Sequence, residues 1–348
     1  MLEVSDRDML QPMATLREVA EAAGVSKAVA SRALTGDFRT RMSEETRRRV
    51  RAVAEELQYV PNHRSRALRF AKSGAVGLIV PDVNNAVFAE MLAGVQDRAG
   101  EAGMSVLLGQ IDPPPAGRDQ LRRLVAEGRV DGVLLQRRED FDDQRLREVL
   151  AGDPPVVLIN SKLAGRAGSV VLDDVRGAAT ATQHLIDLGH ERIGHLAGVA
   201  DHDTAVRRHR GFIETMRAAG LRVRPSWVER SGWEAPGGAA AVTRMMQRKT
   251  RPTALVVSSV NAGIGALSAL SRLGVRVPED LSVVAINDTW VAETWAPALT
   301  TVRMPLRALG RRACGMLLDH LAGQRLGDVV VEEPAPELIV RESTRPVP

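Results

Sequence analysis

The chain has very few of the features that mark secreted, membrane-embedded or disulfide-stabilised proteins. Cys314 is its only cysteine, so an intramolecular disulfide is impossible and a reducing compartment is expected. No apolar run approaches the roughly 18 residues that a membrane-spanning helix needs. The first residues, MLEVSDRDMLQPM, lack the apolar stretch of a secretory signal. These absences favour a cytoplasmic protein with no membrane partner.

The sequence also lacks the motifs of common enzymes and metal proteins. No G-x-G-x-x-G loop follows the first predicted strand, so nothing indicates a dinucleotide cofactor. His184, His190 and His195 lie close together in the sequence, but no cysteine or carboxylate set completes a metal site. Cys314 falls on an apolar helical pattern, which predicts a buried thiol rather than a nucleophile. We therefore expect no enzymatic activity, no metal and no cofactor.

Positive charge is concentrated in one segment. The formal net charge is only +4, but residues 14–72 carry 13 Lys or Arg against 7 Asp or Glu. Residues 73–348 carry equal numbers of basic and acidic side chains. A basic segment on a neutral remainder indicates a nucleic-acid-binding head. On charge alone, a solvated basic face without a partner is the alternative.

The basic segment reads as three helices. Apolar residues at helical spacing predict a first helix that Gly24 ends, because glycine readily adopts the positive φ of a tight turn. Ser26 then caps a second helix and Ser43 a third. Two short helices joined by a glycine turn are typical of a helix-turn-helix unit, and the many alanines allow a close contact between them.

From Ala75 onward, short apolar strands alternate with amphipathic helices, which predicts parallel sheets covered on both faces. Nine strands are expected, too many for one sheet, so we predict two α/β lobes with a ligand cleft at the carboxyl ends of their strands. The predicted strands are 75–80, 105–110, 132–136, 156–160, 169–174, 192–198, 253–259, 281–288 and 337–343.

Six sequence blocks, in this order and spacing, closely resemble the lactose/galactose repressor (LacI/GalR) family. They are LREVAEAAGVSKAVASRAL, SEETRRRVRAVAEELQYVPN, GLIVPDVNNAVFAEMLAGV, HLIDLGHERIGHLAG, LTTVRMP and ELIVRES. The resemblance covers about residues 14–345. It implies an all-α helix-turn-helix head and a hinge helix, joined to a two-lobed α/β body like a periplasmic binding protein with parallel sheets.

The resemblance also implies domain boundaries. We expect an N-terminal extension at 1–13, a helix-turn-helix domain at 14–60, a hinge helix and linker at 61–73, and an effector-binding and dimerisation domain at 74–345. Within the last, the N-lobe takes about 74–170 plus 302–333, and the C-lobe about 171–301 plus 334–345. Met13 is an alternative start to Met1.

The family pattern places DNA contacts on the head and hinge. The second helix would lie in the major groove, where side chains reach base edges and hydroxyls hold phosphates. An apolar hinge residue would enter the minor groove and kink the DNA. The implied base-reading residues are Lys27, Ala28 and Arg32, the phosphate contacts are Thr15, Leu16, Ser26 and Ser31, and the hinge contacts are Asn62, Arg66 and Leu68.

The family pattern places an effector site in the cleft, with some departures. Arg208 matches the arginine that binds effector hydroxyls or carboxylates, Trp233 matches the stacking aromatic, and Asn85 and Phe88 match the first-lobe wall. The departures are Ser259, Val260 and Asn287 where the family commonly has Asn, Asp and Asp, Met304 in place of Gln, and an additional Arg176. Fewer carboxylates and one more arginine indicate a less sugar-like, more anion-tolerant pocket.

The expected function is transcriptional repression by a cytoplasmic homodimer, associated with the nucleoid when it is bound to DNA. A pseudo-palindromic double-stranded operator and a small-molecule effector, a sugar or related metabolite, are the expected partners. One alternative keeps DNA binding but has a degenerate cleft, controlled by a protein partner or not switched at all. A solute-binding protein for uptake would share the body, but the missing signal and the basic head argue against it.

Overall fold

The computed structural model of the chain describes residues 14–35, 42–59, 72–112, 116–152, 154–166 and 168–347. These residues form two compact units, one within residues 1–72 and the other from Ser73 onward. Each unit has its own hydrophobic core. The predicted hinge helix, with Asn62, Arg66 and Leu68, lies outside the described residues.

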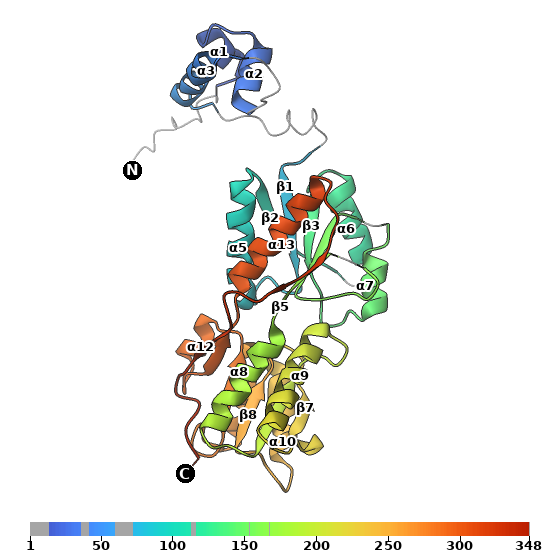
Figure 1. Cartoon of the computed structure of the whole chain (residues 1–348), viewed down its shortest axis with the longest axis vertical. Helices are drawn as coiled ribbons and strands as arrows, with labels where there is room; N and C mark the ends of the chain where they lie inside the picture. The colour runs from blue at the N-terminus through green and yellow to red at the C-terminus, as the bar shows by residue number, and fades with distance from the viewer. Residues whose placement is uncertain are drawn as a thin grey trace, which may run out of the picture. The chain divides into compact units, whose positions relative to one another are not determined.

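The described part of the N-terminal unit contains three helices, α1 (Leu16–Ala22), α2 (Lys27–Thr35) and α3 (Glu44–Glu56) (Figure 1). Gly24, with a φ of 63°, makes the turn between α1 and α2. The core is built largely from small side chains, which let the helices approach closely. Its fully or nearly buried members are Val19, Ala20, Ala23, Ala30, Ala33, Val50 and Ala54.

The N-lobe of the second unit is a parallel six-stranded sheet between two helical layers. Successive residues of its central strands point into two different cores, so these strands are apolar throughout. Helices α5 (Val87–Glu101) and α13 (Leu306–Leu321) cover one face, and α6 (Ala116–Ala126) and α7 (Asp143–Val149) cover the other (Figure 1). The strand order is β11 (Asp328–Val331), β5 (Ser169–Leu172), β4 (Val156–Ile159), β3 (Gly132–Gln136), β1 (Ala75–Val80) and β2 (Ser105–Gln110).

The C-lobe has a second six-stranded sheet. Its strand order is β12 (Glu337–Ile339), β10 (Thr300–Arg303), β9 (Ser282–Ile286), β8 (Ala254–Val257), β6 (Ile193–Ala197) and β7 (Val228–Arg230). All neighbours are parallel except β12, which pairs antiparallel with β10 at the edge. Two helix pairs pack against the sheet, α8 (Asp174–Asp187) with α9 (Asp203–Ala218), and α10 (Ala235–Met246) with α11 (Val260–Arg272). The short helix α12 is formed by Trp290–Thr294.

The chain passes between the two sheets three times: at Asp173, at Met304–Pro305, and between β11 and β12. Strands β7, β10 and β11 are absent from the sequence prediction. β7 has only three residues, and β11 is a half-exposed edge strand, so neither presents a long apolar run. β10 reads TTVR and is polar by composition, although its first three residues are buried. Among the described residues, no helix is long and apolar enough to cross a membrane.

Glycines allow α5 and α13 to meet at backbone distance. A Cβ added at Gly94 would lie 2.0 Å from the carbonyl oxygen of Arg307, and one added at Gly310 would lie 2.1 Å from that of Met91. Both glycines are buried. Any larger residue at either position must push the two helices apart, and both helices also present side chains to the space between the lobes.

We expect Gly94→Ala to lower the free energy of unfolding by about 1–3 kcal/mol, because the new methyl group meets backbone rather than a flexible side chain. The matched control is Gly100→Ala on the same helix, where a Cβ would meet nothing within 4 Å. That control should be neutral or stabilise the protein by about 0.5–1 kcal/mol. Urea unfolding followed by circular dichroism measures both, and equal effects would contradict the packing argument.

Candidate DNA-binding surface and ligand cavity

The exposed face of α2 carries the residues predicted to read DNA. Lys27 and Ala28 are exposed and Ser31 and Arg32 are half-buried, while Ala30 on the opposite face is fully buried. The Nε of Arg32 donates to the carbonyl of Ala28 at 3.1 Å, which lays the side chain along the helix surface. One face of α2 thus packs on the head and the other displays two cations and small polar groups, as groove recognition requires.

The hydroxyl groups predicted to hold phosphates also cap helices. Ser26 Oγ accepts from the backbone N–H of Val29 at 3.3 Å, which leaves its O–H available to donate to a phosphate. Thr15 forms a capping box with Glu18, whose carboxylate accepts both from the Thr15 backbone N–H and from its hydroxyl. A phosphate contact by the Thr15 hydroxyl would therefore compete with Glu18. Leu16 is half-buried and follows Thr15 as the first residue of α1.

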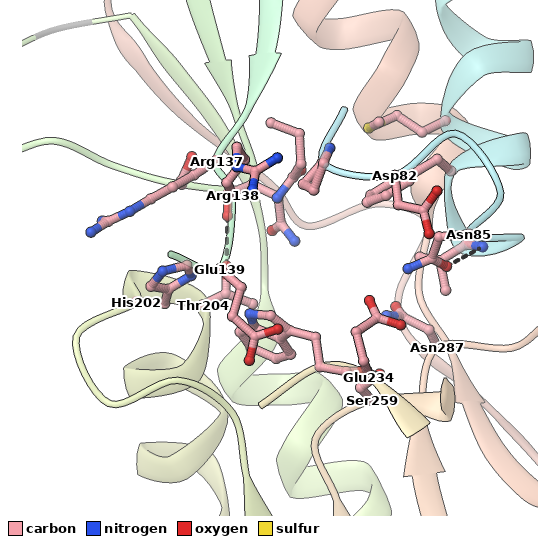
Figure 2. Close-up of a pocket in the computed structure, with 18 of the residues that line it drawn as sticks. Asp82, Asn85, Arg137, Arg138, Glu139, His202, Thr204, Glu234, Ser259 and Asn287 are labelled. Atoms are coloured by element: carbon pink, nitrogen blue, oxygen red, sulfur yellow. Dashed lines mark hydrogen bonds between the residues drawn. The ribbon is translucent and has the colours of Figure 1, made fainter. Parts of the chain in front are cut away.

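A cavity of about 560 Å³ lies between the two lobes of the second unit. Side chains from both lobes surround it (Figure 2). Most of them follow the carboxyl ends of strands, the edge at which open α/β sheets bind ligands. Six of the seven residues predicted for the effector line it: Asn85, Phe88, Arg208, Trp233, Ser259 and Asn287.

Arg208 and Trp233 form the centre of the C-lobe wall. Arg208 is 2% exposed, and its Nε donates to the carboxylate of the fully buried Asp174 at 2.8 Å. Its guanidinium carbon lies 5.6 Å from the centre of the Trp233 ring, a cation–π contact. The carbonyl of Trp233 in turn accepts from the hydroxyl of Ser259 at 2.7 Å. This set presents a half-buried indole ring held by polar contacts behind it.

Arg176 does not line the cavity. It is exposed on the outer side of α8, whose inward positions are Asp174, Gly177, Ala178, Ala181, Thr182 and Leu185. Helical periodicity turns position 176 away from that face. Met304 is also absent from the cavity wall: it is buried at the second crossing, with its sulfur against Gly177.

The cavity wall contains more charged side chains than the sequence analysis considered. Sequence reasoning missed a group of charged lining residues because each follows a strand end that the family pattern did not single out. They are Asp82, Arg137, Arg138, Glu139, Asp140, Asp203 and Glu234. The strand-end rule applied in the sequence analysis is the signal that could have found them.

The arginines of the cavity are already engaged by other groups. Arg138 makes a two-point contact with Asp140, at 2.8 and 3.1 Å, and Arg137 pairs with Asp143 at 2.9 Å. Among the ion pairs between described residues, by contrast, none includes Asp82, Glu139 or Glu234. These three carboxylates therefore dominate the charge that the cavity offers a ligand.

The environment of Glu139 disfavours its charge. Partial desolvation in the cleft raises the pKa of the Glu139 carboxyl, and the neighbouring negative charge of Glu234 raises it further. The backbone N–H of Trp233 has a smaller, opposing effect. On the same rim, desolvation and the positive charge of Arg137 lower the pKa of His202 to about 4, so this imidazole is neutral at physiological pH.

Several buried polar atoms of the cavity wall have no hydrogen-bond partner within the described residues. They are Arg137 Nη2, Asn160 Oδ1, His202 Nε2 and Asn287 Oδ1. Asn160 and Asn287 follow β4 and β9 and adopt positive φ values of 51° and 72°, which asparagine tolerates better than most residues. Unpaired buried polar groups are costly, so their concentration at one cavity indicates a polar ligand.

We expect Glu139→Gln to raise the melting temperature of the ligand-free protein at neutral pH. A raised pKa means that the folded protein holds the proton more tightly than the unfolded chain does, so stability falls as pH rises above the ordinary Glu pKa of about 4.3. Glutamine removes that penalty, and the gain should vanish below about pH 4, where the carboxyl is neutral in both states. Differential scanning calorimetry across pH tests this. Glu148→Gln, on the exposed face of α7, is the control and should show no such trend.

The comparisons with known proteins agree on one family. Residues 15–62 match the family described as bacterial regulatory proteins, lacI family, and residues 182–344 match the periplasmic binding protein-like domain. The HTH-type transcriptional repressor PurR of Photobacterium profundum is 31% identical over 337 residues, 96% of this chain and 99% of that protein.

Two solved structures are similar as well. A LacI family transcriptional regulator from Mycobacterium smegmatis is 58% identical, with a TM-score of 0.75, over 78% of this chain and 99% of that chain. The lac repressor dimer bound to operator and the anti-inducer ONPF is 27% identical, with a TM-score of 0.76, over 96% of this chain and 100% of that chain. The chain therefore belongs to the lacI family of bacterial regulatory proteins, and it is a DNA-binding transcriptional repressor rather than an enzyme.

Proposed function

We propose that this repressor binds a pseudo-palindromic operator as a homodimer, and that a small polar molecule in the cavity between its lobes controls that binding. The observation that carries the ligand control is the cavity itself, which is lined from both lobes. Buried polar atoms without a hydrogen-bond partner among the described residues border it. A sugar or a related polar ring compound fits a wall that combines hydrogen-bonding groups with the Trp233 ring and Phe88. A repressor acting on chromosomal DNA works in the cytoplasm.

Contacts across the cavity supply a means of control. The hydroxyl of Thr204, on α9 of the C-lobe, donates to the carbonyl of Asn160 in the N-lobe at 2.6 Å. Glu139 of the N-lobe lies against the C-lobe backbone, because its Oε1 is 2.0 Å from where a Cβ of Gly232 would be. A ligand that bridges the two walls changes the balance between closed and open lobes, and differential affinity for two such states is what allostery requires.

The edge of the N-lobe sheet supports a dimer. β2 is an edge strand, and its Leu107 and Leu108 are 42% and 40% exposed. An exposed apolar edge strand invites pairing with another chain unless it is covered. The lac repressor structure that this chain resembles is a dimer bound to operator. A two-fold dimer matches an operator with two half-sites.

A degenerate cleft, controlled by a protein partner or not switched at all, is the weaker alternative. If the cleft no longer bound a ligand, substitutions that fill the cavity with apolar side chains would be tolerated. Its wall instead keeps Asn160, His202 and Asn287, each with a buried atom that no other described residue hydrogen-bonds. Without a ligand, such unpaired buried groups lower the stability of the folded protein.

Arg32→Ala should weaken binding to the cognate operator by about 1–3 kcal/mol, because one guanidinium contact to a base is lost. Binding to random DNA should change less, since phosphate contacts dominate there. The operator is first selected from a random duplex library with the full-length protein, and gel shifts then give both affinities. Arg17→Ala on α1, whose side chain pairs with Glu21, is the control and should leave specificity intact. Equal losses on both DNAs would reject the role of Arg32.

Trp233→Ala should abolish the effect of ligand on operator binding while leaving operator affinity without ligand close to that of the parent. The response is measured by gel shift with a panel of sugars, amino sugars and nucleobases. Trp290→Ala removes the side chain of a residue on α12 that is 69% exposed and does not line the cavity, and it should retain the full response. An unchanged dose response in the Trp233 variant would move the ligand site elsewhere.

A further inference from the structure

The charges around the cavity do not balance. Arg137 and Arg138 are paired with Asp143 and Asp140, as described above. Arg208 belongs to a buried group in which Asp174 contacts both Arg207 and Arg208, and Asp203 contacts Arg207. That group holds two cations and two anions.

Three carboxylates remain without a cation among the described residues. Asp82 Oδ1 accepts from the backbone and side-chain amides of Asn84, at 2.9 and 3.0 Å. Glu234 accepts from the amide of Asn261 at 3.3 Å, and no ion pair between described residues includes Glu139. Neutral amides satisfy hydrogen bonds but do not offset charge. With His202 neutral at physiological pH, the cavity carries an excess of negative charge.

Two of these carboxylates come from opposite lobes. Glu139 follows β3 in the N-lobe, and Glu234 precedes α10 in the C-lobe. They are close enough for their charges to interact. Glu139 also rests on Gly232, two residues before Glu234. Closing the lobes therefore brings two like charges together in a partly desolvated space, where their repulsion is stronger than in water.

The described residues offer no preformed metal site that would supply the counter-charge. No group of three or more His, Cys, Asp or Glu side chains among them is arranged to hold a metal ion. The remaining wall is apolar or neutral, with Phe88, Met91 and Leu306 on the N-lobe side and Trp233 on the C-lobe side. Such a wall suits a small organic ring, so the positive charge belongs on the ligand.

We propose that the effector of this repressor is a small polar ring compound with a cationic nitrogen, which binds between Glu139 of one lobe and Glu234 of the other. The ammonium group donates to both carboxylates and removes the repulsion that opposes closure. The orphan oxygens of Asn160 and Asn287 accept from its remaining N–H or O–H groups. Because it concerns the same cavity, this inference rests on the proposed function.

Matched ligands of one scaffold test the proposal. Isothermal titration calorimetry of the full-length protein, at slightly acidic pH where amino sugars are protonated, compares three sets. The cationic set is glucosamine and galactosamine, the neutral set is glucose, galactose and N-acetylglucosamine, and the anionic set is glucuronate. We expect the amines to bind at least about tenfold more tightly than their neutral counterparts, the gain expected for one charge-assisted contact.

Charge-removing variants link that preference to the two residues. Glu139→Gln and Glu234→Gln should each lose the preference for the amine by about tenfold while keeping the affinity for neutral sugars. Glu148→Gln makes the same charge change on the exposed face of α7 and should bind like the parent. Circular dichroism spectra and melting curves of all variants establish that they are folded before binding is compared.

Each outcome is decisive. Preferential amine binding that both cavity variants abolish supports the proposal. Tighter binding of the neutral sugars or of glucuronate overturns the cationic ligand but leaves ligand control of the repressor standing. If no compound of any set binds or changes operator affinity, both the cationic ligand and the proposed control by this cavity are rejected.

Discussion

The geometry of the cleft depends on one buried carboxylate. Asp174 is fully buried, and it contacts Arg208 at 2.8 Å and Arg207 at 2.7 Å. Removing it would leave Arg208 without a carboxylate partner among the described residues and Arg207 with Asp203 alone. Breaking a buried ion pair typically costs about 3–5 kcal/mol. Asp174 is also the first residue of α8, directly after the first crossing between the lobes. From this position the Asp174 carboxylate holds both the crossing segment at Asp173 and the side chain of Arg208. Arg208 in turn donates to the carbonyl of Ser258 and faces Trp233.

The same physics explains why the cleft is acidic. A cation in a desolvated wall is stable only with a partner, and each cavity arginine has an acid or a carbonyl within hydrogen-bond distance. Glu139 and Glu234 lie on loops and are exposed, so they need no cation partner in the way that a buried carboxylate does. Counting arginines and carboxylates therefore misjudges the field that a ligand meets. What matters is which charges are already neutralised.

The head could be predicted from the sequence because its determinants are local. Gly24 makes the turn, Ser26 and Ser43 cap the helices that follow them, and the buried face of α2 repeats at helical spacing. The cleft was predicted less completely because its contacts join residues far apart in the chain. The pairing of Arg138 with Asp140 is local, but the approach of Glu139 to Gly232 exists only in the folded body.

The sequence contained enough information to place Arg176 outside the cavity. The buried positions of α8 recur with a helical period, and position 176 falls between them. Applying that periodicity to the cleft, and not only to the core, would have turned Arg176 outward. The loops that follow parallel strands were a second indication of which residues line the cavity. They include residues 137–140 and 202–204. Helical periodicity predicts which way a side chain points, and the ends of parallel strands predict which loops line the cavity. The pairing of charged side chains, in contrast, can be read only from the tertiary structure.

Strand β1 joins the first residues of the second unit to the cavity wall. Asp131 holds the first residues of the body, accepting from the backbone N–H of Ser73 at 2.6 Å and from that of Gly74 at 3.1 Å. Strand β1 starts at Ala75, and the loop after it carries Asp82 into the cavity wall. One buried strand therefore runs from residues 73–74 to the edge of the cavity. Because closely packed cores resist deformation, a displacement of the loop that carries Asp82 would move β1 and residues 73–74 together.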